Sequence, residues 1–170
     1  MTWGSTWSSY LGPNGNGTAA GKIPVNVQKE GPKVLWRAKV GRGCSSFTIA
    51  AGRAYTVGNS NESDTLWCLD AKTGKILWKK TYSEKLAPKF YDGGPGATPI
   101  VEEGLVYNLS KSGRLSCYDA KTGDEKWVIE YNGQHRVDSL YAKGWSLSLA
   151  KSVYESNCDG DVNAYESTPL

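Results

Sequence analysis

Short runs of apolar residues alternate with turn-forming residues along most of the chain. In the first clear block, segments rich in β-branched and aromatic residues occur at 45–50, 53–57, 65–69 and 75–82. The pair Ala51-Gly52 separates the first two segments, and a polar stretch at 58–64 separates the second from the third. Such segments, with turn residues between them, are typical of antiparallel strands. We therefore expect a four-stranded sheet here, with a loop at 58–64.

The same order of segments returns further along the chain. A second block has its four segments at 97–101, 105–109, 113–118 and 126–131. A third, degraded block follows, in which residues 160–166 align with 113–119 at a distance of 47 residues. Self-similarity at a fixed period indicates a repeat architecture. We divide the chain into a lead-in at 1–30, rich in Gly, Ser and Asn, and repeat blocks at 45–82, 97–131 and 141–170, the last one partial.

The most regular feature is the sequence Asp-Ala-Lys-Thr-Gly, found at 70–74 and again 49 residues later at 119–123, with a tryptophan four residues after each glycine. An aspartate that ends a strand can accept hydrogen bonds from backbone N–H groups two or three residues on, and a glycine supplies the positive φ that closes a hairpin. The tryptophan offers a large area for burial. We interpret both copies as turns and packing anchors, formed by Asp70, Thr73, Gly74, Trp78, Asp119, Thr122, Gly123 and Trp127.

Cysteine positions follow the repeat as well. Cys68 and Cys117 each lie two residues before a repeated aspartate, and Ala164 takes that position in the third block. We interpret them as small buried residues, because a disulfide would need their Cα atoms within about 7 Å. With one histidine and no Cys-x-x-Cys pair, no zinc site is expected.

A period of 47–49 residues with four strands has the size of one propeller blade. A single sheet cannot bury both of its faces, whereas a radial stack of sheets does so with few exposed edges. The predicted fold is all-β, a partial β-propeller of about three four-stranded antiparallel blades. Residues 33–37 copy 75–79 without the turn that precedes them, so we expect one further strand at 33–40.

Composition and charge exclude only a few classes of function. The net charge of +3 comes from 20 basic and 17 acidic residues without a block of like charge, which gives no case for nucleic acid. No apolar run is long enough to span a membrane, and the N-terminus lacks the pattern of a secretory signal.

The repeated motif resembles that of the propeller superfamily named after pyrroloquinoline quinone (PQQ), Ala-x-Asp-x-x-Thr-Gly-x-x-x-Trp, with Cys68 and Cys117 in place of the family alanine. The likeness covers residues 33–166, and the opening Trp-x-x-x-x-Gly-Pro-Asn-x-x-Gly at 7–17 is similar to the start of secreted bacterial members. The resemblance implies that the strand at 33–40 pairs with C-terminal strands to close a ring. The third tryptophan is expected beyond Leu170, so we expect an incomplete ring, an N-terminal fragment of a longer propeller whose open edges favour self-association.

The resemblance also implies two functions. The first is a non-catalytic scaffold that binds protein or ligand, periplasmic or secreted, as in outer-membrane assembly lipoproteins. The alternative is a fragment of a quinoprotein dehydrogenase that uses PQQ and calcium, with its cofactor residues beyond the chain end. Those enzymes carry an adjacent Cys-Cys pair, which this sequence lacks.

No catalytic residue is assigned. The pair Glu102-Glu103 falls in a predicted turn, and His135 falls in a polar loop without an adjacent nucleophile. Because a link from an outer strand to the next inner strand reaches the channel mouth, binding residues are expected there. The predicted surface comprises Arg42, Ser45, Ser46, Lys89, Tyr91, Asp92 and Thr98.

Overall fold

The computed structural model describes residues 6–18, 34–88 and 92–130. The third block, the lone histidine and two predicted surface residues, Lys89 and Tyr91, lie outside these ranges. Within them, no helix is long and apolar enough to cross a membrane.

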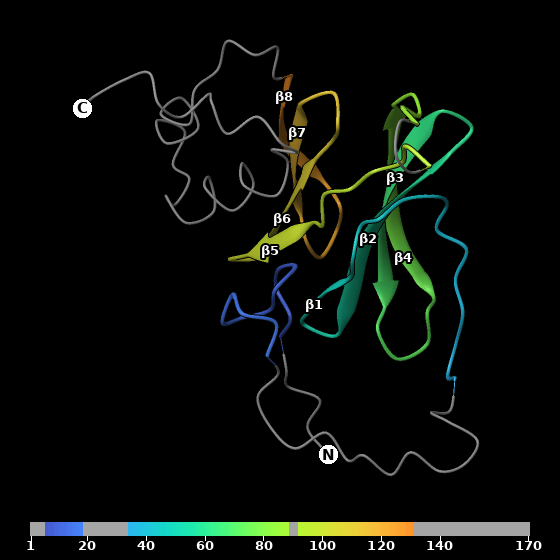
Figure 1. Ribbon diagram of the computed structural model, residues 1–170. Helices are drawn as coiled ribbons and strands as arrows, with labels where there is room; N and C mark the ends of the chain where they lie inside the picture. Colours follow the sequence, from blue (N-terminus) through green and yellow to red (C-terminus); the bar gives the residue numbers. More distant parts are fainter. Residues whose placement is uncertain (1–5, 19–33, 89–91, 131–170) are drawn as a thin grey trace.

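Two four-stranded antiparallel sheets form the described structure, each with its strands in chain order (Figure 1). The first sheet contains β1 (Thr48–Ala50), β2 (Arg53–Ser60), β3 (Ser63–Asp70) and β4 (Ile76–Ser83). The second contains β5 (Ile100–Glu102), β6 (Leu105–Leu109), β7 (Arg114–Asp119) and β8 (Glu125–Glu130). The prediction of successive four-stranded blades is confirmed for these two blocks.

The predicted loop at 58–64 is wrong. Strands β2 and β3 pair from Arg53 with Asp70 to Ser60 with Ser63, so only Asn61 and Glu62 form the turn. Both have positive φ, 52° and 53°, as a tight two-residue hairpin turn requires. Of the polar residues that suggested a loop, Asn59 and Asp64 are instead buried.

The repeated turn has the predicted geometry. Asp70 Oδ1 accepts hydrogen bonds from the backbone N–H groups of Lys72 at 3.1 Å and Thr73 at 2.8 Å, and also from the Thr73 hydroxyl. Asp119 Oδ1 accepts the equivalent backbone bonds at 2.9 Å. These hydrogen bonds, chiefly those from the threonines, hold the pKa of both carboxyls below its usual value. The glycines that end the turns have φ of 71° and 77°.

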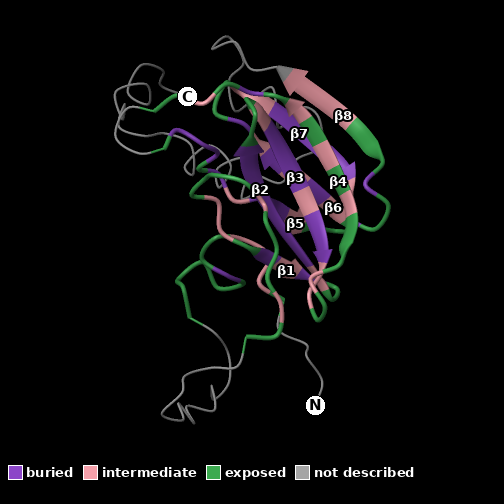
Figure 2. Ribbon diagram, turned by 90° about the vertical axis from the view of Figure 1, so that its right-hand side faces the viewer, coloured by how far each residue is buried: buried purple, intermediate pink, exposed green. Residues whose placement is uncertain are grey.

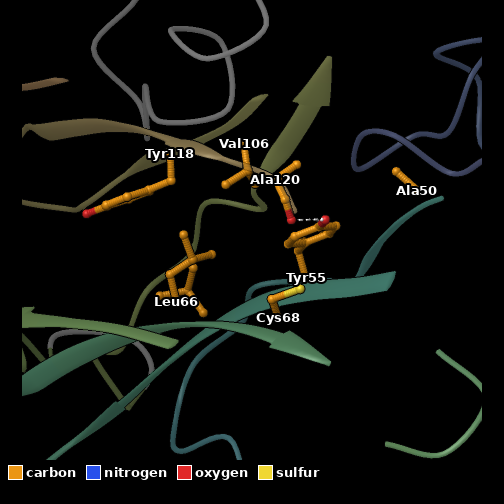
Figure 3. Close-up of a cluster of buried hydrophobic side chains, with 8 residues drawn as sticks. Ala50, Tyr55, Leu66, Cys68, Val106, Tyr118 and Ala120 are labelled. Carbon is orange, nitrogen blue, oxygen red and sulfur yellow. Dashed lines mark hydrogen bonds between the residues drawn. The ribbon is translucent and has the colours of Figure 1, made fainter. Parts of the chain in front are cut away.

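The hydrophobic core lies between the two sheets (Figure 2). Tyr55 from β2 donates its hydroxyl to the carbonyl of Ala120 at 2.8 Å (Figure 3). Trp78 from β4 donates its indole N–H to the same carbonyl at 3.2 Å. The Trp78 ring also lies 5.8 Å from the ring of Tyr55 and 6.5 Å from that of Tyr118. The tryptophan of one blade is thus anchored on the repeated turn of the next.

Glycine is required where the tryptophan of one blade packs on the repeated turn of the next. A Cβ on Gly123 would lie 2.8 Å from Trp78 Cδ2, and one on Gly74 would lie 2.6 Å from the ring of Trp36. Trp36 also donates its indole N–H to the carbonyl of Ala71 at 3.2 Å, as Trp78 does to Ala120. Residues 34–40 therefore contact the first blade as β4 contacts the second, although no strand is assigned to them. Their role in closing a ring stays a prediction.

The segment 6–18, which we call the N-terminal strap, joins the inner strands of both blades. Trp7 exchanges backbone hydrogen bonds with Ile49 of β1 at 2.7 and 2.8 Å, and the carbonyl of Ser8 accepts a bond from Val101 N of β5 at 3.1 Å. In Figure 1 the strap lies beside the labels β1 and β5.

Both repeat cysteines are fully buried free thiols, as predicted. Burial raises the pKa of Cys68 and of Cys117 to about 11, so about a thousandth of either thiol is ionised at pH 8.

We expect timed alkylation with iodoacetamide, followed by peptide mass spectrometry, to label exposed Cys44 first. Labelling of Cys68 in the native protein as fast as Cys44 would contradict this placement.

Candidate functional site

The predicted surface is built around the connection at residues 84–99, which links β4 to β5. Its backbone is held against residues 42–45, since the carbonyl of Pro95 accepts hydrogen bonds from Cys44 N at 2.8 Å and Ser45 N at 3.1 Å. A Cβ on Gly94 would lie 2.7 Å from the carbonyl oxygen of Arg42. The two backbones therefore touch, and this part of the surface has a fixed shape.

Three predicted binding residues are engaged within the fold, Ser45 and Thr98 through their hydroxyls and Ser46 through its backbone. The hydroxyl of Ser45 donates to the carbonyl of Ser46 at 3.1 Å and accepts a bond from Val57 N at 3.3 Å. The hydroxyl of Thr98 accepts a bond from Ser46 N at 3.0 Å. The structure brings these three residues together, but as braces between backbone segments.

Arg42 and Asp92 are the members of the predicted surface whose side chains are described as exposed. Arg42 is anchored through its backbone, which exchanges hydrogen bonds of 2.8 and 2.7 Å with Asn59. Cys44, an exposed thiol in this region, was not among the predicted binding residues, because it lies outside the repeated motif that places Cys68 and Cys117.

An apolar groove lies on the other face of the first blade, opposite the core. Its lining comes from residues 36–39 and from β1 and β2, and comprises Trp36, Arg37, Ala38, Lys39, Phe47, Ile49 and Ala54. Sequence reasoning missed this groove, because it depends on how residues 34–40 cross the sheet.

Titratable residues in the described ranges do not gather around a metal-binding position. No group of three or more His, Cys, Asp or Glu side chains there could hold a metal ion. Glu102 and Glu103 lie in and beside the exposed turn between β5 and β6, as the solvated-turn interpretation predicted.

Sequence reasoning also missed a set of buried polar side chains between the blades. Asn59, Asp64 and Asn108 are each at most 2% exposed, and Tyr82 lies beside them. Their signal in the sequence was a run of polar residues, which is equally typical of a surface loop.

These blades, with the tryptophan of each packed on the turn of its neighbour, define the PQQ-like class of β-propeller repeats. A family model described as outer membrane protein assembly factor BamB matches residues 20–164. The chain belongs to this family. Comparison with curated proteins gives no match.

Solved structures similar to the chain include two kinds of propeller. BamB from Moraxella catarrhalis is 19% identical with a TM-score of 0.43, over 56% of this chain and 26% of that one. A europium-containing methanol dehydrogenase is 25% identical with a TM-score of 0.38, over 50% and 15%. A quinohemoprotein alcohol dehydrogenase from Comamonas testosteroni is 22% identical with a TM-score of 0.41, over 57% and 15%. The match spans about a quarter or less of the length of each.

Proposed function

We propose that the chain is part of a non-catalytic propeller scaffold that binds another protein. The proposal rests on the hydrogen bonds that the described polar groups make within the fold. The repeated carboxylates of Asp70 and Asp119 close turns, and the hydroxyls of Ser45 and Thr98 brace the backbone. Groups engaged in this way are poor candidates for acid–base or nucleophilic chemistry. Membership of a family described as outer membrane protein assembly factor supports a role in assembly, in the periplasm.

The proposed binding surface is the end of the blades that carries residues 84–99. Arg42 and Asp92 expose opposite charges there on a backbone of fixed shape. Loops held on a rigid scaffold are where binding residues concentrate. The surface includes Ser45, Ser46, Lys89, Tyr91 and Thr98 as proposed neighbours of that pair.

Further blades are proposed to complete the ring. The support is the contact of Trp36 with Gly74, which repeats the contact of Trp78 with Gly123. In this arrangement residues 34–40 belong to the outer edge of a preceding blade.

The binding surface can be tested by site-specific photo-crosslinking. A photoreactive amino acid is placed at Asp92, and a control at exposed Lys121 in the turn at the opposite end of the blades. In a periplasmic extract of the producing organism, we expect position 92 to crosslink a component of outer-membrane protein assembly, and Arg42→Glu to reduce the yield severalfold. Equal yields from both positions, or no crosslink at 92, would contradict the proposed surface.

A further inference from the structure

The buried polar side chains between the blades form a connected network, which we call the inter-blade polar cluster. It lies where β4 ends and the connection at 84–99 begins. Cross-strand register places Asp64 of β3 between Asn59 of β2 and Tyr82 of β4, on the face that meets the second blade. The cluster comprises four buried residues (Asn59, Asp64, Glu84 and Asn108), half-buried Tyr82, and Lys111 and Ser112, which are exposed.

Hydrogen bonds of the cluster cross from blade to blade. Within the first blade, Asn59 Nδ2 donates to Asp64 Oδ1 at 2.7 Å and to the carbonyl of Glu84 at 2.8 Å. Between blades, Asn108 Nδ2 donates to the Tyr82 hydroxyl at 2.9 Å, and the Ser112 hydroxyl donates to Glu84 Oε2 at 2.6 Å. The cluster therefore joins β2, β3 and β4 to the β6–β7 hairpin.

Two oxygens of this network lack a donor. Asp64 Oδ2 and Asn59 Oδ1 are both buried without a hydrogen-bond partner, and their residues are 1% and 2% exposed. If Asp64 were a carboxylate, both atoms would be acceptors, and leaving them unpaired would be costly. The Tyr82 hydroxyl lies near enough to Asp64 to favour its charged form, but it does not complete a hydrogen bond to Oδ2.

Charges of both signs lie around Asp64. Glu84 from the end of β4 disfavours a negative Asp64, while Lys111 from the β6–β7 turn favours it. The Lys111 ammonium donates to the carbonyl of Gly93, and the Arg114 guanidinium of β7 lies 5.3 Å from the centre of the Tyr82 ring. Burial is the largest influence and raises the pKa of Asp64.

We propose that Asp64 is held as a neutral acid and acts as a proton-dependent latch between the blades. The proton of the neutral acid is a hydrogen-bond donor, which the two unpaired oxygens otherwise lack. It also needs less space than any ligand that could supply a donor there. Loss of the proton buries a charge beside Glu84 and loosens the blade contact next to residues 84–99. The latch stands apart from the proposed scaffold function, because its evidence lies wholly within the inter-blade polar cluster.

The sign of the pH effect follows from the raised pKa. In the unfolded chain Asp64 ionises near 3.8, so between that pH and the higher pKa of the folded state folding takes up a proton. This contribution is complete below the unfolded pKa and is lost as the pH rises through the folded pKa. Asp70 and Asp119 act in the opposite direction, since their pKa values are lowered. Only a comparison with a variant at position 64 isolates the latch.

The test compares wild type with Asp64→Asn, whose amide keeps a donor at all pH values. Denaturant unfolding is followed from pH 4 to pH 9. Relative to the variant, the folding equilibrium constant of wild type should fall by up to about tenfold per pH unit between the two pKa values. Glu62→Gln, an exposed carboxylate in the same hairpin, should show no such difference.

Infrared difference spectroscopy gives a second measurement. At a pH between the two pKa values, the folded wild type should show a protonated carboxyl band that Asp64→Asn lacks. Two results would overturn the latch. One is that the protonated carboxyl band is already absent from wild type at pH 5. The other is that Asp64→Asn is less stable than wild type by the same amount at every pH. Those results would mean that Asp64 is ionised and that a buried water supplies the missing donors.

Discussion

Replacing Trp78 by alanine is expected to lower the free energy of unfolding by about 3 kcal/mol, the low end of the range for truncating a packed tryptophan, because the side chain is only half-buried. The variant loses ring contacts with Tyr55 and Tyr118 from different blades, and the hydrogen bond to the carbonyl of Ala120. Denaturant unfolding followed by circular dichroism measures the change.

Leu77 provides the matched control. It precedes Trp78 on β4 and is 43% exposed, so Leu77→Ala should cost less than about 1 kcal/mol. Equal effects of the two substitutions would show that Trp78 does not anchor one blade on the next.

Gly58→Ala is expected to destabilise the protein by about 3 kcal/mol or more, at the upper end for overpacked sites. An added Cβ would lie 1.9 Å from the carbonyl oxygen of Val40, and backbone cannot move aside as a flexible side chain can. Relief of this clash would separate residues 34–43 from the first blade and break the hydrogen bond from the Trp67 indole to Val40, now 3.0 Å. The loss is measured by denaturant unfolding.

Gly96→Ala is the control for that substitution. A Cβ there meets nothing within 4 Å, so we expect a change within about 0.5 kcal/mol. If Gly58→Ala were equally mild, residues 34–43 would not lie on the first blade in solution.

Most of the fold prediction came from the sequence repeat. Asp70, Gly74 and Trp78 recur at a fixed spacing, and each residue type has a physical role that the structure confirms. The buried cysteines followed from the same comparison, because an alanine replaces the thiol in the third block.

The errors came from features that the local sequence does not encode. Asn59 and Asp64 were taken for a loop because burial of polar residues depends on partners such as Glu84 and Tyr82, which are distant in sequence. The ring-closing strand expected at 33–40 stays a prediction: no strand is assigned to the described residues 34–40, and strand pairing also needs a neighbouring strand. The candidate binding surface stays a prediction, and the bracing role of the Ser45 hydroxyl depends on a contact with β2 that is distant in sequence.

The central claim is that these blades form a scaffold and not a quinone-dependent enzyme. Its most direct test is titration of the complete propeller, this chain together with the further blades proposed to close its ring, with PQQ and calcium, followed by absorbance of the protein-bound quinone and by dye reduction with alcohols. The account predicts no saturable binding and no alcohol-dependent dye reduction above a protein-free control. Stoichiometric quinone binding accompanied by dye reduction would contradict it.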